Sequence, residues 1–280
     1  MRWTKGYRSR RVIDRRGEGG GGGGPGVGGA FLLARLLPRL GVPGILLVLA
    51  VLCLFNVVGN RSFLAEGPGP AEVGQGHMDD PAAFVSFVLD DNQATWDQLF
   101  RERGAAYAPA EMVLFSGSTL SGCGRGTAEV GPFYCPRDQR VYIDLSFYRD
   151  LANRYGARGD FAQAYVIAHE VGHHVQRQIG DAGGDGRGNE ASIRRELQAD
   201  CLAGVWARSA ASRGLLEVGD LEEGLGAAAA VGDDRLQEAA TGTVRPETWT
   251  HGSAEDRMTW FRRGYDTGAP EGCADASPRG

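Results

Sequence analysis

Three of the five histidines in this 280-residue chain fall close together, at positions 169, 173 and 174. Residues 169–173 read H-E-V-G-H, the pattern H-E-x-x-H, within a segment of helical periodicity. Residues four apart share one face of a helix, so the imidazoles of His169 and His173 can bind one metal ion. Glu170 projects beside that ion and can take a proton from metal-bound water. The pattern predicts a catalytic zinc site.

A third protein ligand is expected, because catalytic zinc usually has three protein ligands and one open position. Residues 196–200, E-L-Q-A-D, supply a candidate on the next predicted helix. We expect Glu196 to complete a His2Glu site, and Asp200 to accept the other ring N–H of a ligating histidine. The alternative is that both are ordinary solvated charges. The apolar residues that follow, C-L-A-G-V-W-A at 201–207, weaken that alternative.

Two further histidines are weaker candidates. His174 points about 100° away from His173 around the helix, so we expect it to hydrogen-bond at the helix surface rather than bind the metal. His251 lies in W-T-H-G, just before the last predicted helix. It can reach the site and stabilise an oxyanion, as a catalytic residue beside Glu170. The alternative for His251, a solvated loop histidine, stays open.

The elements that must position these residues are mostly helical. Periodicity and capping residues predict helices that begin near Asp80-Pro81 and Ser253, and that cover 147–155, 161–178, 190–211 and 220–239. Short apolar runs rich in β-forming residues predict strands over 112–115 and 141–145. A loop with five glycines, 180–188, separates the two motif helices. These elements predict a mostly helical α+β domain with a small β-sheet over residues 78–280.

These motifs resemble those of the bacterial neutral zinc metallopeptidase family. The resemblance rests on H-E-V-G-H-H, on R-R-E-L-Q-A-D-C-L-A-G-V-W-A, on T-H-G-S-A-E-D-R and on residues 131–147, G-P-F-Y-C-P-R-D-Q-R-V-Y-I-D-L-S-F. It implies a membrane-anchored peptidase of zincin-like fold. It also implies metal ligands His169, His173 and Glu196, the base Glu170, and Asp200 behind the ligands. The E-x-x-x-D element is similar to the second motif of gluzincins, but the glycine-rich connector departs from their pattern.

Residues 40–59 form an uncharged apolar run bracketed by Arg39 and Arg61. In a helix, twenty residues span about 30 Å, the hydrocarbon thickness of a bilayer. We predict one uncleaved transmembrane helix, followed by a flexible linker over 60–77. A buried core helix would carry a more polar face, and a signal peptide would have a shorter apolar run.

Charge is unevenly distributed along the chain. The first forty residues hold nine basic and two acidic side chains, which leaves 21 basic and 33 acidic ones in the remainder. The basic flank predicts that residues 1–39, with their glycine tract at 17–29, are cytoplasmic and that the domain lies outside the membrane. The acidic body argues against a nucleic-acid partner.

Four of the five cysteines fall in the predicted domain, at 123, 135, 201 and 273. Disulfides persist outside the cytoplasm, and four cysteines allow three pairings. Cys123 and Cys135 flank a glycine-rich turn, which favours pairing them and leaves Cys201 with Cys273. Zinc-ribbon binding is disfavoured because no C-x2-C spacing occurs.

The predicted function is hydrolysis of peptide bonds in a peptide or protein substrate, with Zn²⁺ as cofactor and Glu170 as general base. We also expect residues 141–145 to offer a strand edge to an extended substrate. The alternative is a catalytically silent, membrane-anchored zinc-binding scaffold. Against it, a structural zinc site usually has four protein ligands, whereas three are found, and a scaffold has no use for Glu170.

Overall fold

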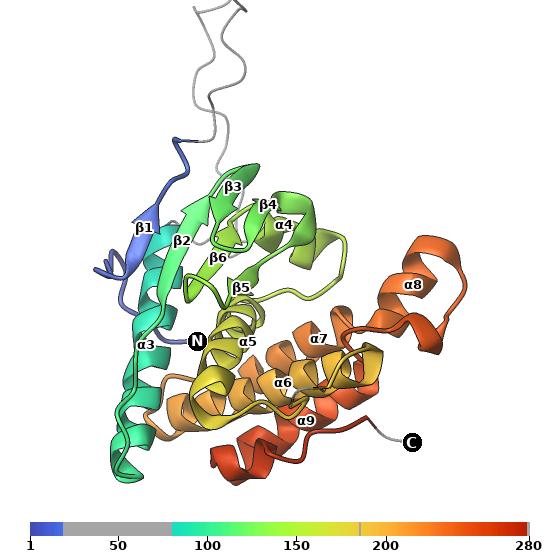
Figure 1. Cartoon of the computed structure of the whole chain (residues 1–280). Helices are drawn as coiled ribbons and strands as arrows, with labels where there is room; N and C mark the ends of the chain where they lie inside the picture. The colour runs from blue at the N-terminus through green and yellow to red at the C-terminus, as the bar shows by residue number, and fades with distance from the viewer. Residues whose placement is uncertain (19–79, 185, 279–280) are drawn as a thin grey trace, which may run out of the picture. The chain divides into compact units, whose positions relative to one another are not determined.

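The computed structural model describes residues 1–18, 80–184 and 186–278 (Figure 1). In these residues the chain forms seven α-helices and two β-sheets. Residues 1–18 and those from 80 onward belong to one compact unit. The predicted α+β class, mostly helical with a small sheet, is confirmed.

The larger sheet has four short strands in the order β1-β2-β6-β5. β1 and β6 both run parallel to β2, whereas β5 is antiparallel to β6. Their bounds are Val12–Asp14 (β1), Glu111–Phe115 (β2), Phe133–Cys135 (β5) and Arg140–Asp144 (β6). The two predicted strands are therefore β2 and β6, within one residue at each end. β1 and β5 were not predicted, because three residues are too few to show a period.

The expectation of a free strand edge at residues 141–145 is wrong. β6 is paired on both sides, to β2 and to β5, so its backbone groups are already used in the ladder. β5 lies at the end of the strand order and contacts α5. The sheet edge beside the candidate site is therefore β5.

Both predicted disulfides are confirmed. Cys123 lies in the turn of a hairpin formed by β3 (Ser118–Ser121) and β4 (Gly124–Thr127), and its bond to Cys135 ties that turn to β5. The second bond joins Cys201 to Cys273 across 72 positions of sequence. It fastens the C-terminal turn to the helix that carries Glu196 and Asp200.

The helices match the periodicity closely. Their bounds are Pro81–Glu102 (α3), Phe147–Asn153 (α4), Asp160–Ile179 (α5), Asn189–Ser212 (α6), Asp220–Ala230 (α7), Asp233–Thr241 (α8) and Ala254–Thr267 (α9). Asp80 and Ser253 cap α3 and α9 by accepting backbone N–H groups, as expected. The predicted helix over 220–239 is two helices, α7 and α8. Gly232 separates them in an extended conformation, where a β-carbon would meet the backbone nitrogen of Ala254 at 2.4 Å.

α5 is the central helix, in contact with α3, α6, α7, β5 and β6 (Figure 1). Two glycine contacts bring the helices around the motif unusually close. A β-carbon at Gly172 on α5 would lie 2.9 Å from the carbonyl oxygen of Ala199 on α6. A β-carbon at Gly264 on α9 would lie 1.8 Å from the carbonyl oxygen of Cys201 on α6. Only glycine permits these approaches, so α5, α6 and α9 are held as a tight group.

Residues 1–18 were expected to belong to a separate cytoplasmic segment, but they pack on the domain. β1 pairs in register with β2, and the ring of Trp3 meets that of Phe84 on α3 edge to face, 5.4 Å between centroids. The predicted membrane run 40–59 and linker 60–77 lie outside the described residues. In the described part of the chain, no helix combines the length and apolarity needed to span a bilayer.

Candidate metal centre

α5 and α6 bring together the three residues predicted to bind zinc. One donor atom from each of His169, His173 and Glu196 lies within 4.8 Å of the other two. His169 Nε2 is 3.2 Å from Glu196 Oε2, and His173 Nε2 is 3.5 Å from Glu196 Oε1. Tetrahedral zinc with bonds of 2.0–2.2 Å separates its ligand atoms by about 3.3–3.5 Å. The spacing of these donors fits a zinc ion.

The other ring nitrogens of the two histidines are each held by an acceptor. His169 Nδ1 lies 2.8 Å from Asp200 Oδ1, and His173 Nδ1 lies 2.9 Å from Gln176 Oε1. The amide of Gln176 is itself oriented, because its nitrogen donates to the carbonyl oxygen of Arg195 at 2.6 Å. Carboxylate and amide oxygens only accept, so each Nδ1 carries the proton. Without metal, a proton on Nε2 can bridge each ring to Glu196, and with metal bound each Nε2 would turn its lone pair to the ion.

Asp200 is fully buried and anchors a polar network behind the ligands. Arg257 on α9 donates to both of its oxygens, from Nε at 2.8 Å and from Nη2 at 3.0 Å. The hydroxyl of Tyr165 on α5 donates to Asp200 Oδ1, and Arg257 Nη1 donates to the carbonyl oxygen of Val231 at 3.1 Å. A buried carboxylate is stable only with such partners, so Asp200 on α6 is fixed in place by side chains from α5 and α9.

The site carries an excess of acidic charge. Burial alone would lower the pKa of His169, but the charge and hydrogen bond of Asp200 raise it to about 10. Burial would raise the pKa of Glu196, yet the two neighbouring imidazoles hold it well below its usual range. In the absence of metal the histidines therefore attract protons, and a divalent cation must displace those protons to bind.

Glu170 lines a cleft of about 630 Å³ that the three metal-binding candidates also line. Its side chain is almost buried, with 8% of the residue surface exposed. Within the described part of the chain, no hydrogen bond or ion pair engages its carboxylate. Both oxygens are therefore free to accept a proton from water in the cleft, which is the geometry required of a general base.

His251 lines the same cleft. It lies in the loop between α8 and α9, distant in sequence from the H-E-x-x-H motif. Its Nδ1 lies 3.2 Å from Oδ1 of Asp233, the first residue of α8. Asp233 Oδ2 also accepts backbone N–H groups from Thr250, His251 and Gly252 at 2.7, 2.6 and 3.1 Å. This carboxylate thus holds the loop, and among the described residues no hydrogen bond engages Nε2 of His251.

His174 does not join the metal-binding group, as predicted, but its expected surface position is wrong. The residue is buried. Its Nε2 lies 2.5 Å from the carbonyl oxygen of Ala108, a contact that requires the proton on that nitrogen, and its Nδ1 lies 3.0 Å from the hydroxyl of Tyr134. His174 therefore links α5 to the segment before β2 and to the cleft wall on β5.

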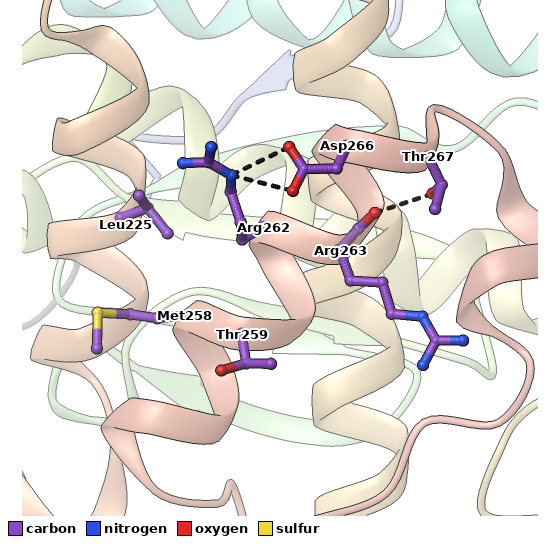
Figure 2. A pocket seen from close by; sticks show the side chains of 7 residues that line it. All are labelled: Leu225, Met258, Thr259, Arg262, Arg263, Asp266 and Thr267. Carbon is purple, nitrogen blue, oxygen red and sulfur yellow. Dashed lines mark hydrogen bonds and ion pairs between the residues drawn. The ribbon is translucent and has the colours of Figure 1, made fainter.

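A second hollow, of about 530 Å³, lies on α9 beside α7 (Figure 2). Its charged side chains are exposed and paired, Arg263 with Asp275 outside the hollow at 3.0 Å. Arg262 Nε donates to both oxygens of Asp266 at 3.0 and 3.2 Å, and the hydroxyl of Thr267 donates to the carbonyl oxygen of Arg263. It contains none of the predicted site residues and no nucleophile, so the chemistry belongs to the first cleft.

Comparisons with known proteins agree with this geometry. A family model described as "Putative neutral zinc metallopeptidase" matches residues 1–276. The chain belongs to the neutral zinc metallopeptidase family. It is 44% identical over 288 residues to "Uncharacterized protein YpfJ" of Escherichia coli (strain K12), covering 98% of each chain. It is 46% identical over 195 residues to "Uncharacterized protein Rv2575" of Mycobacterium tuberculosis (strain ATCC 25618 / H37Rv), covering 64% of this chain and 65% of that one. No solved structure matches it significantly.

Sequence reasoning missed three residues that complete the site. Arg257 and Tyr165 hold Asp200, and Asp233 holds His251. Arg257 ends the motif T-H-G-S-A-E-D-R, and an arginine inside an amphipathic helix can be a buried partner for a buried acid. Nothing in the sequence distinguishes Asp233 from the adjacent Asp234, since both suit the first turn of a helix.

Proposed function

We propose that the protein is a zinc-dependent peptidase. The observation that carries this proposal is a single cleft containing a His2Glu group at zinc spacing and the carboxylate of Glu170, which no other described residue engages. Membership of a zinc metallopeptidase family supports the same conclusion. His169, His173 and Glu196 would hold the ion, and Asp200 would fix the orientation of His169.

Zinc bound here would supply Lewis-acid activation of water and of the scissile carbonyl. Glu170 would take the proton from the attacking water and pass it to the leaving amine, since its carboxylate is close to the ligands but not engaged. His251, held by Asp233, would donate to the oxyanion of the tetrahedral intermediate. Each role is filled by a different side chain of the cleft.

An extended peptide would bind along β5. Residues 128–134 form one wall of the cleft, and β5 is the sheet edge on that side. A substrate strand can add to such an edge by backbone hydrogen bonds, with its side chains entering the cleft on alternate positions. The aromatic rings of Phe133, Phe147 and Tyr155 line the cleft and would favour apolar side chains in the substrate.

The second candidate function is a membrane-anchored zinc-binding scaffold without catalysis. A purely structural zinc ion would be enclosed by four protein ligands. In the described residues the group has three members, and it lies in an open cleft with Glu170 beside it. These features favour the peptidase.

The test compares the full-length protein with Glu170→Gln and with the control Glu222→Gln, an exposed carboxylate on α7 outside the cleft. Zinc content is measured by mass spectrometry and activity with a mixed peptide library. One zinc per chain in all three, with activity lost only in Glu170→Gln, supports the peptidase. Zinc in all three without any hydrolysis favours the scaffold. Absence of zinc from the unmodified protein contradicts both.

We further propose that the catalytic domain lies outside the cytoplasm, attached to the membrane through residues 40–59. The two disulfides support this location, because bonds of this kind persist in oxidising compartments. The apolar run is long enough to enter the hydrocarbon of a bilayer.

A further inference from the structure

We propose that residues 1–18 are a strap that is part of the folded peptidase domain, and that strap and domain therefore lie on the same side of the membrane. This inference goes beyond the proposed function and replaces the expectation that residues 1–39 face the cytoplasm opposite the domain. It rests on contacts between described residues.

The first set of contacts is a backbone ladder. β1 pairs in parallel with β2 over three positions, Ile13 opposite Val113 at the centre. The ladder is extended at both ends, because the amide of Met112 donates to the carbonyl oxygen of Arg11 at 2.9 Å and the amide of Arg15 donates to that of Leu114 at 2.8 Å. β1 thus covers an edge of β2 that would otherwise expose unpaired backbone groups.

The second set joins the strap to α3. Tyr7 and Ser9 both donate to the carboxylate of Asp90, at 3.0 and 2.8 Å. The ring of Tyr7 also meets that of Phe87 edge to face, 5.7 Å between centroids. Together with the contact of Trp3 and Phe84, these interactions place aromatic and polar anchors along two turns of one helix.

The strap's basic charge also has partners in the domain. Arg8 lies 2.7 Å from Asp80, Arg2 lies 3.4 Å from Glu217, and Arg11 lies 3.8 Å from Asp90. Exposed pairs of this kind add little stability individually. They show, however, that the arginines complement the acidic body, so their presence does not require a cytoplasmic location.

These contacts constrain topology. A chain that crossed the bilayer once between residues 18 and 80 would put the strap and the domain about 30 Å apart, on opposite faces of the hydrocarbon. No hydrogen bond or ring contact reaches across that distance. The observed ladder therefore requires the same side for both, so residues 40–59 would hold the protein at the membrane without making a single crossing of the bilayer.

The test uses the full-length protein in spheroplasts, with Cys53 replaced by serine so that the four disulfide cysteines alone remain. One reporter is Arg10→Cys, in the exposed part of the strap, and the other is Val218→Cys, which is fully exposed in the domain. Each is treated with a membrane-impermeant maleimide before and after lysis. Labelling of both before lysis, or of neither, supports the proposal. Labelling of one only overturns it.

A second measurement tests the contact itself. The double variant Ser9→Cys/Asp90→Cys also carries a protease site within the glycine tract. It is treated in the membrane with a short thiol cross-linker and then cleaved at that site. Fragments that stay joined after cleavage support docking. The mismatched pair Ser9→Cys with Thr243→Cys is the control, since β1 and the segment after α8 lie at opposite ends of the unit (Figure 1). Cross-linking no greater than in the mismatched pair overturns the proposal.

Discussion

Two histidines that line the same cleft, His169 and His251, are each paired with a carboxylate, and the surroundings of the two pairs differ sharply. The side chains of Asp200 and His169 are 0% and 8% exposed, whereas those of Asp233 and His251 are 12% and 49% exposed. Asp200 is held by a guanidinium and a phenol from the helices α9 and α5. Asp233 is held by three backbone N–H groups of one loop.

The difference indicates that the two pairs have different roles. A metal ligand must keep one position. Asp200 and His169, the buried pair, keep theirs because water cannot reach them and replace their hydrogen-bond partners. A group that meets substrate must be accessible. In the second pair, Asp233 and His251 (the rim pair), Asp233 fixes the loop and leaves the imidazole of His251 exposed. The buried pair should therefore govern stability and zinc affinity, and the rim pair should govern turnover.

The largest effect is expected from Arg257→Met. This change leaves the charge of Asp200 buried without its main cation, so we expect a loss of about 3–5 kcal/mol in the free energy of unfolding. Urea denaturation of metal-free protein measures it, with Arg245→Met on an exposed loop as control. If the charge is the cause, adding Asp200→Asn to Arg257→Met recovers part of the loss. A loss below about 1 kcal/mol would contradict the role given to Arg257.

The second prediction is that His251→Ala lowers turnover without affecting zinc binding, which would distinguish the role of the rim pair from that of the buried pair. Removing one oxyanion donor typically lowers kcat by about 10²–10³-fold. We expect that fall in turnover of a peptide substrate with unchanged zinc content and a urea midpoint lowered only slightly, by loss of the contact with Asp233. The side chain is half exposed, so little packing is lost. A variant with near-normal turnover would show that His251 is merely solvated.

Asp200→Asn is expected to weaken zinc binding by about 10–100-fold, because the amide no longer fixes His169 as an anion does. Competition against a chromophoric chelator measures the affinity. Asp233→Asn is the matched control and should leave zinc affinity unchanged. Equal losses in the two variants would remove the distinction between the buried and the rim pair.

The smallest expected effect is on how the stability of the protein depends on pH. Burial alone would raise the pKa of Asp233, but its hydrogen bonds to His251 and to the loop backbone lower it below the usual value. A carboxyl whose folded pKa is depressed stabilises the protein above its unfolded pKa, near 4, and the contribution disappears as pH falls through the folded pKa. The stability difference between the wild type and Asp233→Asn should thus be greatest above about pH 5 and vanish on acidification. Urea midpoints across that range test the sign.

Local signals in the sequence predicted the parts of the site that lie within one or two helices. The ligands on α5 and α6 follow from i,i+4 spacing, and both helix bounds fall within two residues of the prediction. Arg257 could not be assigned in this way, because it meets Asp200 from 57 positions away and only tertiary packing joins them. The same holds for β1, whose residues pair with residues 100 positions later.

The edges of the sheet show a second limit to prediction from sequence. An apolar run reveals a strand but not its neighbours, so the free edge was assigned to β6 instead of β5. Phe133–Cys135 has too few residues to display alternation, although it forms the wall of the cleft. Pairing order depends on contacts between distant segments, and the sequence pattern of one segment does not contain it.

The close contact of Gly172 with Ala199 gives the catalytic motif an additional requirement. In the general pattern H-E-x-x-H the two middle positions are free, but here the second of them touches the backbone of the partner helix. Any side chain at that position would move α6 outward and carry Glu196 away from the two histidines. For proteins with this helix arrangement, a search for functional relatives should therefore demand H-E-x-G-H, and a chain with a bulky residue there should be expected to have lost its third ligand.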